Sequence, residues 1–134
     1  MALEKKVPDI CNYAMFCAGC GHGVLVRLIC ECLEEFGLEK DTIAAIGVGC
    51  SCHLKTAIDC DLVQSPHGRA AAVATGIRRA EPTKFVFTYQ GDGDAYNIGI
   101  AETLNAAYRN ENICVFVVNN NNFGMTGGQM SWCT

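Results

Sequence analysis

Two oxygen-bearing side chains are spaced in this sequence in a way that suits a divalent cation. Asp92 lies in the turn Gly91-Asp92-Gly93, and Asn120 follows it 28 positions later. Glycines on both sides of Asp92 let the backbone approach a ligand closely. The Asp92 carboxylate, the Asn120 amide oxygen and the Asn122 carbonyl would form part of an octahedron around Mg²⁺, which phosphate oxygens and water would complete. Taken alone, a Gly-Asp-Gly turn is more often an ordinary tight turn.

Cysteine is the second residue type in this sequence that could bind a metal, and the chain has ten cysteines in 134 residues. Cys17 and Cys20 form a Cys-x-x-Cys that is followed by Gly21-His22, and this spacing lets two thiolates bind one metal centre. A zinc knuckle, a redox pair, an iron–sulfur cluster and coincidence all remain open, because no second Cys-x-x-Cys completes a four-cysteine zinc site. Cysteines inside predicted helices and strands are expected to behave as small hydrophobic residues, and these are Cys30, Cys32 and Cys114.

Composition limits the classes of protein to which the chain can belong. Half of the residues are hydrophobic and 18% are charged, which excludes a disordered chain. The net charge of −4, without a long run of Lys and Arg, argues against a nucleic-acid partner. No apolar run approaches the ~20 residues of a membrane helix, and no signal peptide is recognisable. We therefore expect a cytoplasmic protein with reduced thiols, suited to cells that avoid oxygen.

The elements that must position these groups alternate along the chain. Short apolar runs predict strands buried on both faces at 42–48, 84–89 and 113–118. Apolar periodicity predicts helices at 24–36, closed by Gly37, and at 69–80 and 98–109. The alternation indicates the α/β class, with a parallel sheet flanked by helices. We expect residues 1–134 to form one domain that includes the cysteine-containing segment 11–23.

Ligands of open parallel sheets bind in the loops at the carboxyl ends of the strands. Three such loops directly follow predicted strands, at 47–53, 91–94 and 119–128. One helix and one strand separate Asp92 from Asn120, so both side chains should emerge at the same sheet edge.

Several stretches resemble a known family. Residues 91–120 resemble the thiamine diphosphate motif, in which a Gly-Asp-Gly is followed by Asn-Asn. CAGCGHG at 17–23, SPHGRAAAVATGI at 65–77 and NNFGMTGGQM at 121–130 resemble the β subunit of the 2-oxoacid:ferredoxin oxidoreductases. The stretch FVFTYQGDGD at 85–94 looks most like the branched-chain, 2-ketoisovalerate members.

The resemblance implies that the chain binds thiamine diphosphate and Mg²⁺. Asp92 and Asn120 would bind the ion by their side chains and Asn122 by its carbonyl, while Gly93 and Thr126 would donate to the diphosphate. The full set of cofactor-binding candidates is Cys50, Ser51, His67, Gly91, Asp92, Gly93, Asn120, Asn122, Gly124, Met125 and Thr126.

Two of these candidates keep a second interpretation. Met125 would lie near the thiazolium or serve as a core methionine. His67 would donate to the diphosphate or to a substrate carboxylate, or would be a histidine at the start of a helix. His53 faces either the substrate or solvent.

For the cysteines, the resemblance implies a [4Fe–4S] cluster on Cys17, Cys20 and Cys50. The fourth ligand of the family lies in a region beyond Thr134, so the domain looks C-terminally short and this ligand is not identified in the chain. Substitutes would have to come from Cys52, Cys60 and Cys133.

The implied function is oxidative decarboxylation of a 2-oxoacid to an acyl-CoA, with electrons passing through the cluster to ferredoxin. The resemblance favours 2-ketoisovalerate over 2-oxoglutarate or pyruvate. No catalytic residue is assigned to this chain, because in thiamine enzymes the activating glutamate comes from a pyrimidine-binding domain, which we expect on an obligate α subunit. Two alternatives are a cluster-free thiamine diphosphate decarboxylase or carboligase subunit and a truncated, non-catalytic cofactor-binding module.

Overall fold

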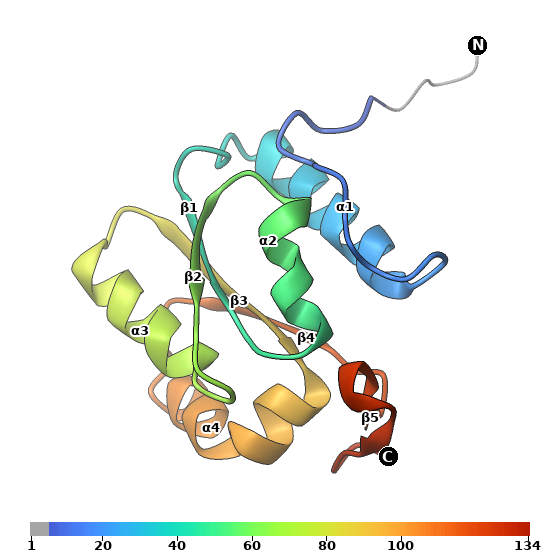
Figure 1. Cartoon of the computed structure of the whole chain (residues 1–134). Coiled ribbons are helices and arrows are strands. Elements are labelled where there is room, and N and C mark those ends of the chain that lie inside the picture. Colours follow the sequence, from blue (N-terminus) through green and yellow to red (C-terminus); the bar gives the residue numbers. More distant parts are fainter. Residues whose placement is uncertain (1–5) are drawn as a thin grey trace.

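The computed structural model describes residues 6–134 (Figure 1). Its main sheet has four strands in the order β2-β1-β3-β4, and every neighbouring pair is parallel. The strands are β1 (Thr42–Ile46), β2 (Asp61–Gln64), β3 (Phe85–Gly91) and β4 (Cys114–Val118). The predicted α/β class with a parallel sheet is confirmed.

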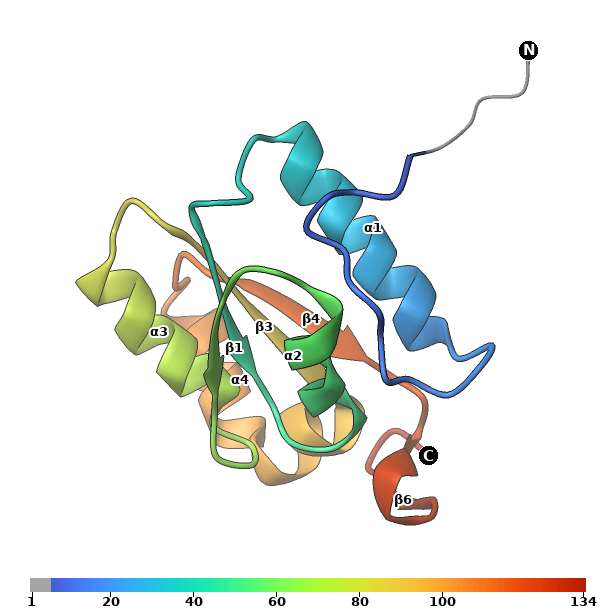
Figure 2. The ribbon, with the colours of Figure 1, turned by 45° about the horizontal axis from the view of Figure 1, so that its top comes forward.

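Helices cover both faces of this sheet (Figures 1 and 2). They are α1 (Gly21–Glu35), α2 (Leu54–Ala57), α3 (Ala70–Ala80) and α4 (Ile100–Tyr108). α1 and α2 lie on one face, and α3 and α4 lie together on the other. Within residues 6–134, no helix combines the length and the apolar character needed to cross a membrane.

The alternation of side chains along β1 and β3 divides the core into two layers. On one face Phe87 and Tyr89 pack with residues of α1 and α2. On the other face Ala45 and Val86 pack against Ala74 of α3. β3 is buried on both faces, as predicted, because α1 and α2 cover one face of the sheet and α3 covers the other.

The prediction of burial on both faces is wrong for β4. This strand is only partly covered, and Val115 is 38% exposed. β4 is one of the two outer strands, so one of its edges has no neighbouring strand within residues 6–134.

The apolar stripe predicted for the first helix is also only partly correct. The buried residues of α1 are His22, Val26, Ile29, Cys30 and Leu33. Leu28 and Phe36 are exposed, and Cys32 is exposed rather than in the core as predicted. These three side chains border an apolar groove between α1 and the sheet, so the stripe is wider than the face that the sheet covers. The helix ends as predicted, with Gly37 at φ +64° after the final turn.

Several elements near the strand ends were not predicted. β2 is short and mostly exposed, so it lacks the apolar run used to recognise the other strands. The loop after β1 forms a 3₁₀ turn at Cys50–His53, and β3 is followed by a π-helical turn at Gly93–Ile98. The C-terminal segment forms a small hairpin of β5 (Asn122–Phe123) and β6 (Gln129–Met130) beyond the carboxyl end of β4 (Figure 2).

Candidate functional site

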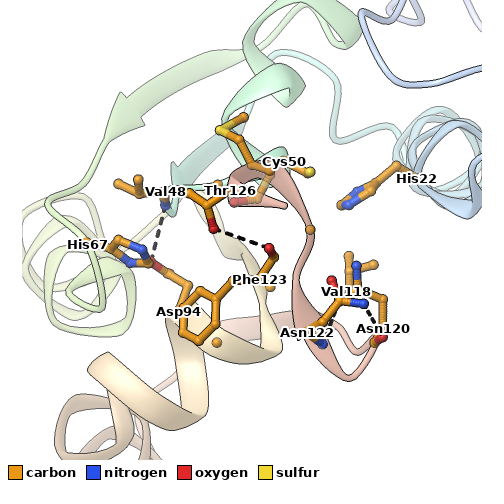
Figure 3. Close-up of a pocket in the computed structure, with 16 residues that line it drawn as sticks. His22, Val48, Cys50, His67, Asp94, Val118, Asn120, Asn122, Phe123 and Thr126 are labelled. Atoms are coloured by element: carbon orange, nitrogen blue, oxygen red, sulfur yellow. Dashed lines mark hydrogen bonds and ion pairs between the residues drawn. The ribbon is translucent and has the colours of Figure 1, made fainter. Parts of the chain in front are cut away.

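A pocket opens where the loops after β1, β3 and β4 meet (Figure 3). Parallel strands bring these loops to one edge, as the sequence predicted. The predicted site residues that line the pocket are Cys50, Ser51, His67, Gly91, Gly93, Asn120, Asn122, Gly124, Met125 and Thr126. Lining residues that the sequence did not predict as site residues are His22, Val48, Gly49, Asp94, Val118 and Phe123. None of the lining residues is Lys or Arg.

Asp92 is the one predicted cofactor-binding residue that does not line the pocket. It is completely buried at the start of the π-helical turn. Its Oδ1 accepts a hydrogen bond from the backbone amide of Asn120 at 3.4 Å, and its Oδ2 accepts one from the Ser131 hydroxyl. The carboxylate is thus held between the end of β3, the end of β4 and the C-terminal segment.

The side-chain amide of Asn120 joins this carboxylate to Asn122. One terminal atom of the amide lies 2.8 Å from the carbonyl oxygen of Asn122 and 3.0 Å from Oδ1 of Asp92. When that atom is nitrogen, it donates to both oxygens. When it is oxygen, three oxygens face one another, and a shared cation would satisfy them.

The spacing of these atoms suits a small cation. Mg²⁺ binds oxygen at about 2.0–2.1 Å in octahedral geometry, which places adjacent ligands about 2.9 Å apart. Both contacts of the Asn120 amide are close to this value. Asp92, Asn120 and Asn122 therefore form a donor set with the chemistry and the spacing of part of a magnesium site.

A second buried carboxylate, Asp94, connects three parts of the chain. Its Oδ1 accepts hydrogen bonds from the backbone amides of Val48 at 3.2 Å and Gly68 at 2.9 Å, and from Nδ1 of His67. Its Oδ2 accepts from Nε2 of Gln90 at 2.8 Å. Asp94 was not predicted as a site residue, although it directly follows the Gly-Asp-Gly turn, because three of its four partners lie 26 to 46 residues away in the sequence.

His67 is oriented by Asp94 and by an aromatic neighbour. Nδ1 of His67 contacts Asp94, so Nε2 is the ring nitrogen of His67 that does not take part in this contact. The ring stands edge-on to Phe123, with the centroids 6.4 Å apart. His67 therefore approaches the pocket from the loop before α3 with a defined ring orientation.

Ser51 has an unpaired hydroxyl beside the pocket. The residue is 1% exposed, and its Oγ has no hydrogen-bond partner. A buried polar group without a partner is unfavourable, so a ligand atom that reaches this hydroxyl would relieve the cost.

The Cys-x-x-Cys segment forms a tight turn at the start of α1. The amide of Cys20 donates to the carbonyl of Cys17 at 3.0 Å, and Gly19 has φ +76°. A positive φ at this position is typical of a type II turn, which favours glycine. The turn holds Cys17 and Cys20 at the end of α1 nearest the pocket.

Cys50 is the cysteine that lines the pocket. Burial raises the pKa of its thiol above the ordinary value of 9.0, and the nearby Cys17 and Cys20 raise it further. Among residues 6–134, no three His, Cys, Asp or Glu side chains are grouped closely enough to hold a single metal ion.

The remaining cysteine and histidine candidates lie outside the pocket lining. Cys60 packs against the core, and burial raises its pKa to about 12. Cys52 lies in the 3₁₀ turn beside Cys50, and Cys133 lies in the C-terminal segment. His53 stands edge-on to Phe16, with the ring centroids 6.0 Å apart.

His22 is a second histidine in the pocket lining that the sequence did not predict as a site residue. It is 5% exposed, stacks on Phe16 with centroids 4.7 Å apart, and contacts the Tyr89 hydroxyl through Nδ1 at 2.7 Å. Burial, followed by the charge of His53, lowers the pKa of His22 below its ordinary value of 6.5. Burial raises the pKa of Tyr89.

A family model described as "Thiamine pyrophosphate enzyme, C-terminal TPP binding domain" matches residues 47–134. This match covers all three strand-end loops of the pocket.

Curated relatives and a solved structure agree with the family match. Ketoisovalerate oxidoreductase subunit VorA of Methanothermobacter marburgensis is 52% identical over 96% of this chain and 27% of its own length. 2-Oxoglutarate synthase subunit KorB of Methanocaldococcus jannaschii is 41% identical over 96% of this chain and 46% of its own length. A structure of 2-oxoglutarate:ferredoxin oxidoreductase from Magnetococcus marinus superimposes with a TM-score of 0.89 and 32% identity, over 96% of this chain and 45% of that one. The predicted resemblance is confirmed, and the chain spans less than half the length of each of these proteins.

Proposed function

This chain belongs to the family of thiamine pyrophosphate enzymes, in the part that forms their C-terminal TPP-binding domain, and on that basis we propose that it is the cofactor-binding part of a 2-oxoacid:ferredoxin oxidoreductase. The names of its relatives support this class of enzyme. The observation that carries the proposal is the convergence of Asp92, Asn120 and Asn122 beside the pocket.

In the proposed complex, the side chains of Asp92 and Asn120 and the carbonyl of Asn122 would hold Mg²⁺. The buried carboxylate would supply negative charge, and diphosphate oxygens and water would supply the remaining ligands. Gly93 and Thr126 donate to the diphosphate, and the unpaired hydroxyl of Ser51 gains a partner. Met125 lies beside the thiazolium, since it is 47% exposed at the pocket and not in the core.

Thiamine diphosphate, when bound, supplies the nucleophilic carbon and the electron sink for decarboxylation of a 2-oxoacid. The residues of this chain bind and orient it. Asp94 holds His67 by Nδ1, so the imidazole presents its other nitrogen to an anionic group of the cofactor or the substrate.

We propose that Cys17, Cys20 and Cys50 bind a [4Fe–4S] cluster that passes electrons to ferredoxin. Each thiolate of such a cluster binds a different iron, so its ligands are farther apart than those of a single ion. Burial raises the pKa of Cys50 first, and Cys17 and Cys20 lie close enough to raise it further, which supports the grouping of these three thiols. The fourth ligand is not identified in this chain.

For the substrate we propose 2-ketoisovalerate, since the ketoisovalerate relative has higher identity than the 2-oxoglutarate relative. The acyl group passes to CoA. A partner subunit contributes the pyrimidine-binding domain and the activating glutamate, and we place the complex in the cytoplasm, where thiols remain reduced. Turnover of 2-ketoisovalerate, 2-oxoglutarate and pyruvate by the assembled enzyme, followed by reduction of ferredoxin, tests this assignment.

Calorimetric titration with thiamine diphosphate tests the cofactor site. Wild-type protein should bind only when Mg²⁺ is present. Asp92→Asn should weaken binding by about a hundredfold, because the charged ligand of the ion is lost. Asp59→Ala, which changes an exposed carboxylate, is the control. Equal affinity of Asp92→Asn and wild type would show that the metal assignment is wrong.

Analysis of iron and acid-labile sulfide in anaerobically purified complex tests the cluster. Cys17→Ser should lower both contents, whereas Cys32→Ser, at an exposed cysteine on α1, should change neither. A complex that binds thiamine diphosphate but contains no iron would favour the cluster-free decarboxylase or carboligase.

A further inference from the structure

The His22 imidazole is held rigidly at the pocket wall. It lies in the first turn of α1, stacks on Phe16 with an interplanar angle of 5°, and contacts the hydroxyl of Tyr89 through Nδ1 at 2.7 Å. Its side chain points into the pocket from the side opposite His67 (Figure 3). Two neighbours therefore fix the ring, and its remaining edge faces the ligand space.

The contact with Tyr89 determines which ring nitrogen carries the proton. Tyr89 is completely buried, and His22 Nδ1 is the one hydrogen-bond partner of its hydroxyl within residues 6–134. If Nδ1 carried a proton, the phenol would have no acceptor for its own, and a buried donor without a partner is costly. Tyr89 therefore donates to Nδ1, and Nε2 carries the proton of a neutral ring.

The Nε2 atom of His22 is free to donate to a ligand. It has no hydrogen-bond partner among the described residues, and it is not among the polar atoms sealed from solvent. His22 lines the pocket together with Cys50 and Asn120, whereas no Lys or Arg does so. A carboxylate is usually bound by two parallel donors of an Arg, but a single neutral N–H matches a single oxygen.

We propose that His22 donates from Nε2 to the keto oxygen of the bound 2-oxoacid. This oxygen gains negative charge when the adjacent carbon is attacked, and a fixed donor in a buried site stabilises that charge. Tyr89 acts as the positioning residue, because it sets the tautomer of the ring. The proposal rests on the proposed function and assigns one substrate contact within it.

The tautomer is tested without turnover. In solid-state ¹⁵N NMR of the assembled complex, with the three histidines of this chain labelled, His22 should show a protonated Nε2 and an unprotonated Nδ1. The signal is assigned by its loss in His22→Gln. Tyr89→Phe should remove this preference for one tautomer. The opposite tautomer, or a doubly protonated ring, in the wild type would overturn the proposal.

Kinetics of the assembled enzyme test the role in the reaction. His22→Asn should lower kcat by about a hundredfold with KM changed less than about threefold, as expected for a contact made in the transition state. His22→Gln should recover about tenfold of this loss, because its amide nitrogen reaches the position of Nε2. Asp59→Ala, at an exposed carboxylate outside the pocket lining, is the control and should keep wild-type kcat.

Two further outcomes separate this proposal from the proposed function. An effect of His22→Asn on KM alone, or none on kcat, would overturn the role of His22. Thiamine diphosphate should bind to His22→Asn as it binds to wild type. If the wild type itself did not bind thiamine diphosphate, the proposed function would fail, while the tautomer measurement would still report on His22.

Discussion

Replacement of Asp94 gives the sharpest test of how this site is assembled. Asp94 is 2% exposed and accepts hydrogen bonds from Val48, Gly68, Gln90 and His67. Asp94→Ala removes all four acceptor contacts at once. Asp94→Asn keeps one oxygen for the two backbone amides and the imidazole.

The magnitudes follow from the donors that would be left unpaired. His67 is partly exposed and can turn to water, but the Gly68 amide and the Gln90 side chain are buried. Each unpaired buried donor costs about 1–3 kcal/mol, so Asp94→Ala should lower the free energy of unfolding by about 4 kcal/mol.

The asparagine variant should be much milder. The Oε1 atom of Gln90 is buried and unpaired in the wild type. Rotation of the Gln90 amide by half a turn lets Oε1 accept from the amide nitrogen introduced at position 94, so the cost should be about 1 kcal/mol or less.

Urea unfolding followed by circular dichroism measures both variants, with Asp59→Ala as the exposed-carboxylate control. A difference of about 3 kcal/mol between the two Asp94 variants corresponds to roughly 10 °C in Tm. If Asp94→Ala were as stable as wild type, or if Asp94→Asn were as unstable as Asp94→Ala, the role of this carboxylate as a shared acceptor would be refuted.

Three further predictions concern the stability and the affinity of the same region. Gly68→Ala should lower the free energy of unfolding by about 2–3 kcal/mol, because Gly68 has φ +77° and a Cβ would lie 2.7 Å from the Gly99 nitrogen. Gly76→Ala is the control, because nothing lies within 4 Å of a Cβ added there. Urea unfolding measures both variants. Ser131→Ala removes the donor to Asp92 Oδ2 and should weaken thiamine diphosphate binding by about fivefold in calorimetric titration. Burial raises the pKa of Cys30, with a contribution from Cys11, from 9.0 to about 12. The unfolded chain therefore binds fewer protons above pH 9.0, so the stability that is complete below this pH should fall as the pH rises toward 12, by about 1.4 kcal/mol per pH unit. Urea unfolding across this range should give a shallower decline for Cys30→Ala.

Each of these predictions has a contradicting result. Equal destabilisation by Gly68→Ala and Gly76→Ala would show that the local clash is unimportant. Unchanged affinity in Ser131→Ala would show that the hydroxyl does not orient Asp92. An alkaline decline that is the same in wild type and Cys30→Ala would assign it to other groups.

The sequence predicted the sheet well where local pattern and burial agree. The runs at β1 and β3 are apolar because both faces are covered, and the helices α3 and α4 begin within about two residues of their predicted starts. β2 has no such run, since it is an exposed outer strand, and β4 has an apolar run although its edge is open. Apolar periodicity indicates which side chains favour burial, but it does not indicate whether another helix or strand covers them.

In the candidate site, too, some features follow from local sequence pattern and others depend on tertiary packing. The order of the predicted parallel strands was enough to place the loops after three strands at one edge, with Asp92 and Asn120 following neighbouring strands. The folded structure was needed to show that Asp94 joins the loops of Val48 and His67, and that Tyr89 contacts His22 at the pocket wall. The partners in these contacts are 27 to 67 residues apart, and no local pattern encodes which buried donor meets which acceptor. That pairing depends on how α1, the sheet and the loops pack together, so it becomes visible only once the chain is folded.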